Sequence, residues 1–161
     1  MRTYILVTFV VAMLLGGCSA PSSTTPSMSM GSMGGAAAAV TQPDNLDLAA
    51  TARSQLGLFT VSYTSDLDPV TINKLHTWML HVAAADGQPL DGAAVTIDGG
   101  MPQHNHGLPT QPIVTPVGNG DYRVEGMKFQ MPGWWTVTVT VTDTAGGATQ
   151  EDSTTFNLLL Q

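Results

Sequence analysis

Apolar and polar residues alternate with a period of two through most of the chain beyond about Leu56. This alternation is typical of β-strands with one buried face. The longest example starts at Trp135, where every second residue is apolar and threonines occupy the positions between them. The alternation therefore predicts several strands that bury one face in a common core. Their apolar positions are Phe59, Val61 and Tyr63 in the first, Trp78, Leu80 and Val82 in the second, and Trp135, Val137, Val139 and Val141 in the strongest.

Turn signals separate these strands at intervals of roughly ten residues, as Asp-Gly, Asn-Gly and Gly-Gly pairs. Residues 99–120 carry four prolines and predict a long loop, with at most a short edge strand around Ile113 and Val114. After this loop Tyr122 and Val124 are expected to face inward. About seven short strands with no helical period predict an all-β fold, an immunoglobulin-like antiparallel β-sandwich.

The clearest chemical signal is the stretch Asp98 to Gly107, which reads Asp-Gly-Gly-Met-Pro-Gln-His-Asn-His-Gly. Alternate residues of an extended segment point the same way, so His104 and His106 could present two imidazoles to one ion. Met101 in the same stretch, and Met131 in a later Met-Pro-Gly segment, could add sulfur ligands. Imidazole and thioether together suit copper better than zinc. These four residues are the predicted metal site.

An architectural role is the alternative for the same residues. A histidine in a tight loop often bonds a backbone group, and Met-Pro segments can act as packing plugs at the end of a sandwich. Of the other histidines, His76 begins a strand and could approach the same end of the domain, whereas His81 is expected to be exposed. The sequence leaves both interpretations of the loop open.

The N-terminal segment predicts export. Arg2 precedes an apolar run that is too short for a confident membrane-spanning helix, and Leu-Gly-Gly-Cys follows it. This arrangement resembles the processing site of bacterial lipoproteins, which implies lipidation of Cys18 and a periplasm-facing anchor, with the outer membrane favoured. The alternative is an ordinary secretory signal. The expected organisation is a signal peptide over residues 1–17, the lipidated cysteine and a low-complexity tether over 18–52, and the β-sandwich domain over 53–161.

Composition excludes some function classes. Five basic against twelve acidic side chains give a net charge of −7, which argues against binding nucleic acid. The single cysteine allows no intrachain disulfide. No nucleophile elbow, His-Glu-x-x-His or glycine-rich phosphate loop is present, so we expect a protein without enzymatic activity. The expected partners are a membrane, through the lipid anchor, a metal ion and an envelope protein.

Three motifs carry a family resemblance. They are Gly-Met-Pro-Gln-His-Asn-His-Gly at residues 100–107, Gly-Asp-Tyr-Arg-Val-Glu-Gly-Met-Lys-Phe at 120–129 and Met-Pro-Gly-Trp-Trp at 131–135. Together they resemble the YtkA-like domain, related to the FixH family, over about residues 56–160. The resemblance implies an immunoglobulin-like sandwich in the cell envelope and, through FixH, a link to cation handling and oxidase maturation. Two hypotheses follow: a copper-binding envelope lipoprotein that sequesters or delivers the ion, or a structural or protein-interaction module that binds no metal.

Overall fold

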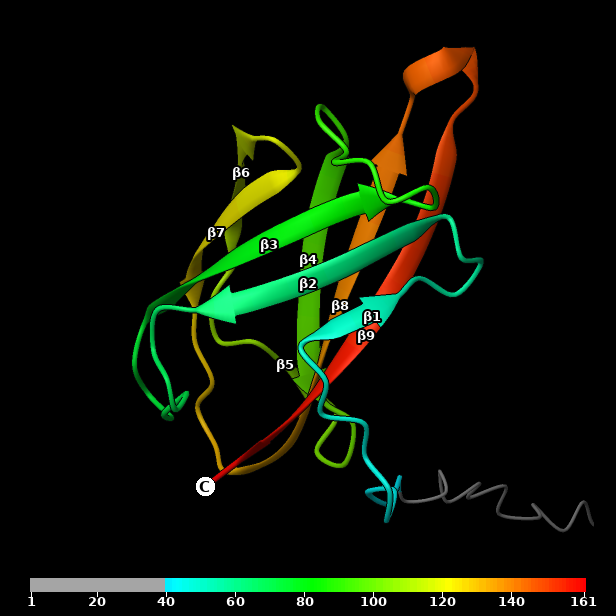
Figure 1. Ribbon diagram of the computed structural model, residues 1–161. Helices are drawn as coiled ribbons and strands as arrows, with labels where there is room; N and C mark the ends of the chain where they lie inside the picture. Colours follow the sequence, from blue (N-terminus) through cyan, green and yellow to red (C-terminus); the bar gives the residue numbers. More distant parts are fainter. Residues whose placement is uncertain (1–39) are drawn as a thin grey trace, which may run out of the picture. The chain divides into compact units, whose positions relative to one another are not determined.

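Nine strands form two antiparallel sheets in residues 40–161, the part of the chain that the computed structural model describes (Figure 1). The predicted signal peptide, Cys18 and most of the predicted tether lie outside these described residues. One sheet has the order β1-β2-β3-β7-β6 and the other the order β5-β4-β8-β9. The strands are β1 (Thr51–Arg53), β2 (Phe59–Ser65), β3 (His76–Ala84), β4 (Ala94–Met101), β5 (His106–Gly107), β6 (Ile113–Gly118), β7 (Asp121–Met127), β8 (Gly133–Asp143) and β9 (Gln150–Leu160).

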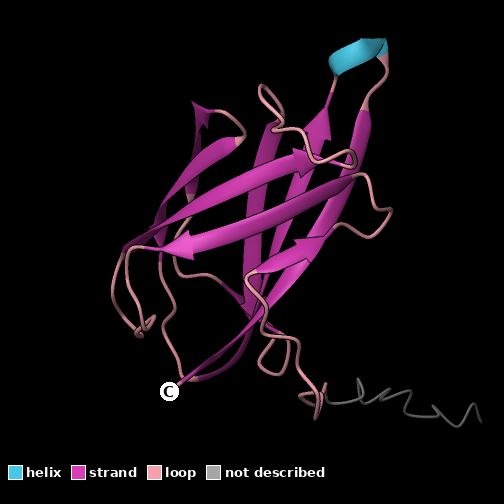
Figure 2. Ribbon diagram, in the orientation of Figure 1, coloured by secondary structure: helices cyan, strands magenta, loops and turns pink. Residues whose placement is uncertain are grey.

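The strand order confirms the immunoglobulin-like sandwich. Without the short edge strands β1 and β5, the sheets read β2-β3-β7-β6 and β4-β8-β9. When these seven strands are lettered A to G along the chain, the orders become ABED and CFG, the arrangement of constant-type immunoglobulin domains. Figure 2 shows strands throughout the domain and one short helical turn, Ala145–Gly147, between β8 and β9. Within residues 40–161 no helix is long and apolar enough to cross a membrane.

The core lies between the two sheets and consists of the apolar positions that the alternation predicts. Strand β8 is paired on both sides, with β4 and with β9, and alternates buried with half-buried residues from Trp135 to Val141. Trp78 on β3 and Tyr122 on β7 face it from the other sheet, both almost fully buried. Burial of apolar area of this kind contributes roughly 25 cal/mol per Å². With no disulfide available, this core is the main source of stability.

The region predicted as a long loop contains more strand than expected. Strand β4 continues through two glycines to Met101, β5 follows, and the predicted edge strand extends over Ile113–Gly118. The glycines hide the strand pattern because they carry no side chain that could alternate. They also permit the pairing, since a Cβ on Gly100 would lie 2.8 Å from the carbonyl oxygen of His106. Pro116 is tolerated because β6 is at the edge of its sheet.

A buried carboxylate on β9 accepts hydrogen bonds from the connection between β1 and β2. The oxygens of Asp152 accept hydrogen bonds from the backbone N–H groups of Leu56 at 2.9 Å, Leu58 at 3.3 Å and Ser153 at 2.8 Å. Burial by itself raises the pKa of this carboxyl, but the Ser54 side chain and the backbone donors outweigh it and hold the pKa below its usual value. The charged form of Asp152 is therefore the one that the fold stabilises.

Replacement of Asp152 by Asn should weaken the acid sensitivity of the fold. Because the folded-state pKa is the lower one, the carboxylate stabilises the protein fully above the unfolded pKa near 3.8 and loses this effect as the pH falls through the folded pKa. Asp152→Asn should therefore destabilise the domain at pH 7 and flatten its stability between about pH 5 and the acid limit. Urea unfolding across pH measures this, with the exposed neighbour Glu151→Gln as control. Parallel pH profiles for wild type and Asp152→Asn would contradict the assignment.

Candidate metal site

The hairpin formed by β4 and β5 carries three of the four predicted ligands. Met101 on β4 is the direct pairing partner of His106 on β5. Directly opposed residues in an antiparallel pair have Cβ atoms about 4.5–5.5 Å apart and side chains on the same face. The turn between them is closed by the carbonyl of Met101, which accepts hydrogen bonds at 3.0 Å from the backbone N–H groups of both His104 and Asn105. The pairing therefore sets a thioether beside an imidazole.

The second imidazole of the hairpin is close to the first. The ring centroids of His104 and His106 lie 5.7 Å apart, and the ring planes are inclined by 21°. Two imidazoles that bind one ion through nitrogens at about 2.0–2.1 Å place their centroids roughly 5–6 Å apart. His104 is exposed and His106 half-buried. The spacing thus fits a shared ion that is reached from solvent on the side of His104.

His106 is held by the segment that connects β7 to β8. The amide Nε2 of Gln130 lies 3.3 Å from His106 Nδ1 and 3.4 Å from the carbonyl oxygen of Gly107. The carbonyl can only accept, so the amide nitrogen faces both groups as a donor and His106 Nδ1 is an acceptor. An ion at Nδ1 would displace this amide. An ion at Nε2 would leave the imidazole hydrogen on Nδ1, so the amide group of Gln130 would have to turn its oxygen toward that nitrogen. Gln130 is a contact of the site that the sequence analysis missed, because glutamine carries no ligand signature.

Met101 and Met131 have different surroundings. Met101 is 1% exposed, and a Cβ on Gly133 would lie 3.0 Å from its terminal methyl carbon. Met131 follows Gln130, and its carbonyl oxygen accepts a hydrogen bond of 2.9 Å from Trp135 Nε1, while its residue is 37% exposed. The structure brings Met101, His104 and His106 together and places Met131 on the neighbouring connection with an exposed side chain.

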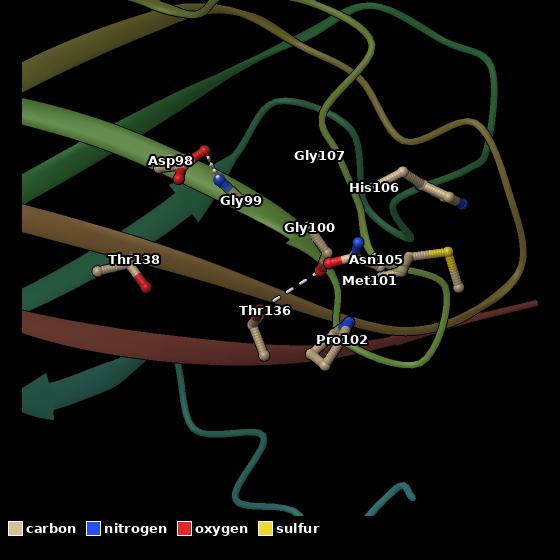
Figure 3. A pocket seen from close by; sticks show the side chains of 10 residues that line it. All are labelled: Asp98, Gly99, Gly100, Met101, Pro102, Asn105, His106, Gly107, Thr136 and Thr138. Atoms are coloured by element: carbon tan, nitrogen blue, oxygen red, sulfur yellow. Dashed lines mark hydrogen bonds between the residues drawn. The ribbon is translucent and has the colours of Figure 1, made fainter. Parts of the chain in front are cut away.

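A shallow depression lies beside the hairpin, and Met101 and His106 are among the residues that line it. It has a volume of about 340 Å³ and is lined by β4, β5 and the threonines of β8. In the view of Figure 3 the thioether of Met101 and the ring of His106 extend in the same direction, away from Thr136 and Thr138. The thioether of Met101 and the ring of His106 therefore lie on the same side of the hairpin.

The other two histidines are not part of the hairpin, although ring contacts through Phe129 and Trp135 link His76 to His106. His81 is partly exposed, as expected, and its Nδ1 is 2.7 Å from a carboxylate oxygen of Asp121, its direct partner on β7. This pair was not predicted because forty residues separate its members. His76 is buried. Across residues 40–161 no group of three or more His, Cys, Asp or Glu side chains is placed to hold a metal ion, so the candidate site depends on thioether sulfur.

Replacement of Gly133 by Ala should displace Met101 and cost more than the same change at an open glycine. Gly133 has φ 120° and Gly146 has φ 79°, so alanine is strained at both, by about 1–3 kcal/mol. Only at Gly133 would the new Cβ also approach the Met101 methyl, whereas nothing lies within 4 Å of that position at Gly146. Urea unfolding should show the larger loss for Gly133→Ala, with a shifted Met101 methyl resonance. Equal losses and an unmoved resonance would contradict this contact.

One comparison with known proteins gives a match. A family model described as YtkA-like matches residues 57–140, which span β2 to most of β8 and include the whole hairpin. No curated protein and no solved structure gives a match. The matched segment is just over half of the 161 residues. The chain therefore belongs to the YtkA-like family.

Proposed function

We propose that this protein is a copper-binding lipoprotein of the bacterial cell envelope that sequesters or delivers the ion without catalysing a reaction. The observation that carries the proposal is the pairing of Met101 with His106, with the His104 ring 5.7 Å from the His106 ring. Met131 is proposed as a further ligand, supplied when its exposed side chain turns toward the hairpin.

The ligand chemistry favours copper over zinc or a hard cation. Structural zinc sites use Cys and His, and calcium and magnesium prefer oxygen ligands. The hairpin offers two imidazoles and a thioether, and it has no neighbouring cluster of acidic side chains in the described residues. Soft sulfur together with imidazole suits Cu(I), and the imidazoles also suit Cu(II).

The placement of the ligands supports exchange of the ion with a partner. Met101 is buried, whereas His104 and Met131 lie at the solvent side. An ion bound between them is reached from outside without unfolding of the core. The predicted lipid anchor at Cys18 would keep the domain in the envelope, where such a transfer partner would be met.

An architectural role for the hairpin is the competing proposal, and one contact favours it. The hydrogen bond from Gln130 occupies His106 Nδ1, as expected of a histidine that joins two connections at the end of the sandwich. In that case the domain is a structural or protein-interaction module, and loss of the imidazoles affects stability and not metal affinity.

Removal of both imidazoles should abolish tight copper binding. We would titrate the full chain in detergent micelles with Cu(I), against a chromogenic competitor, and with Cu(II), following tryptophan fluorescence. Trp135 lies 6.0 Å from His106, so bound Cu(II) should quench it. His104→Ala/His106→Ala should weaken binding by at least about a hundredfold, or roughly 2.7 kcal/mol, since each tenfold loss corresponds to about 1.4 kcal/mol.

The matched control is His81→Ala, which removes an imidazole from the outer face of the other sheet and should leave copper affinity unchanged. Methionines of the predicted tether are present in every variant, so copper that they bind appears as a residual binding common to all variants. Equal, weak binding by wild type and the double variant, with a lower free energy of unfolding for the variant, would overturn the proposal in favour of the architectural role.

A further inference from the structure

A second imidazole and thioether belong to paired residues of β3 and β7, both buried in the core. His76, the first residue of β3, is 5% exposed, and its Nδ1 lies 3.2 Å from the carbonyl oxygen of Lys74. Because a carbonyl only accepts, Nδ1 carries the hydrogen and Nε2 keeps its free lone pair. Nε2 is buried and has no hydrogen-bond partner. Metal-binding histidines have this arrangement, in which the distal N–H donates to a carbonyl and the other nitrogen faces the ion.

A β-bulge turns a methionine toward this imidazole. Val124 on β7 faces inward opposite Trp78, and Glu125 faces outward opposite Thr77. Regular alternation would then direct Met127 outward. Instead the register shifts between His76 and Thr77, so that Met127 is the partner of His76 and is fully buried. Gly126, with φ 87°, is the extra residue. Bulges of this kind re-aim a side chain and are over-represented beside functional sites.

The bulge is fixed by a contact from outside the strand pair. The hydroxyl of Thr110 donates a hydrogen bond of 2.7 Å to the carbonyl of Gly126. Direct partners have Cβ atoms about 4.5–5.5 Å apart, within reach of one ion for an imidazole nitrogen and a thioether sulfur. The rings of Phe129 and Trp78 lie 5.6 and 6.5 Å from the imidazole, so the surroundings are apolar. A divalent ion would be strongly disfavoured in such surroundings, and a soft monovalent ion less so.

We infer that His76 Nε2 and the Met127 sulfur form a second, buried site for a soft monovalent cation, Cu(I) or its analogue Ag(I). The two imidazoles belong to different strand pairs, β3–β7 in one sheet and β4–β5 in the other. Ring contacts of 5.6, 5.1 and 6.0 Å through Phe129 and Trp135 link them. The inference does not depend on copper binding by His104 and His106.

The test uses Ag(I), a redox-inert probe, with the full chain in detergent micelles and chloride-free buffer. We would label methionine methyl groups with ¹³C and start from the His104→Ala/His106→Ala variant, which lacks the hairpin imidazoles. One equivalent of Ag(I) should shift the Met127 methyl resonance and the His76 ring resonances together, with saturation. In the wild type, the Met101 methyl and the His104 and His106 rings report separately on the proposed hairpin site.

Met127→Leu keeps an apolar side chain of similar volume and removes the sulfur, so the fold should survive. In this variant the Ag(I)-dependent shift of His76 should be lost or require at least about tenfold more silver, a factor that corresponds to about 1.4 kcal/mol. The matched control is Met79→Leu, which changes an exposed methionine on the outer face of β3, the strand that begins at His76. The inference is overturned if the Met127 methyl is unmoved by silver, or if His76 shifts equally in the Met127→Leu and Met79→Leu variants.

Discussion

The register of the strand pairs decides which side chains meet in this domain. In a β-strand a shift of one residue moves every following side chain to the other face. Each inward-facing pair therefore depends on a regular register or on a bulge that restores it. Met101 is paired with His106 because β4 and β5 pair at that residue. Met127 is paired with His76 because a β-bulge shifts the register of β7 against β3. Both thioether–imidazole pairs are therefore set by the backbone register.

The sandwich supports this register without a covalent cross-link. Strand β8 is paired along most of its length on one side and along its whole length on the other, which fixes the position of Trp135. The ring of Trp135 packs against both Phe129 and His106, and its N–H donates to the carbonyl of Met131. One buried tryptophan thus joins the core, the hairpin and the β7–β8 connection. Contacts with neighbouring residues hold Met101 and His106, which lowers the cost of ordering these two ligands around an ion.

Much of the fold was predictable because period-two alternation directly reports burial on one face of a sheet. Phe59, Trp78, Tyr122 and Val137 were all assigned to the core from this pattern, and all are buried. The end of β4, the strand β5 and the bulge at Gly126 were not predicted. Glycine carries no side chain to alternate, and pairing between distant segments leaves no local signal. The same limit explains why Gln130 and the partnership of His76 with Met127 appear only in three dimensions, whereas the clustering of Met101, His104 and His106 is already visible in one stretch.

X-ray absorption of the protein loaded with one equivalent of Cu(I) shows directly whether the hairpin binds copper. Copper bound by the hairpin should have a mixed shell of nitrogen and sulfur neighbours, with multiple scattering from imidazole that is reduced by loss of His104 and His106. A first shell of sulfur alone, unchanged in that double variant, would contradict copper binding by the hairpin, because the copper would then be bound by methionines outside it.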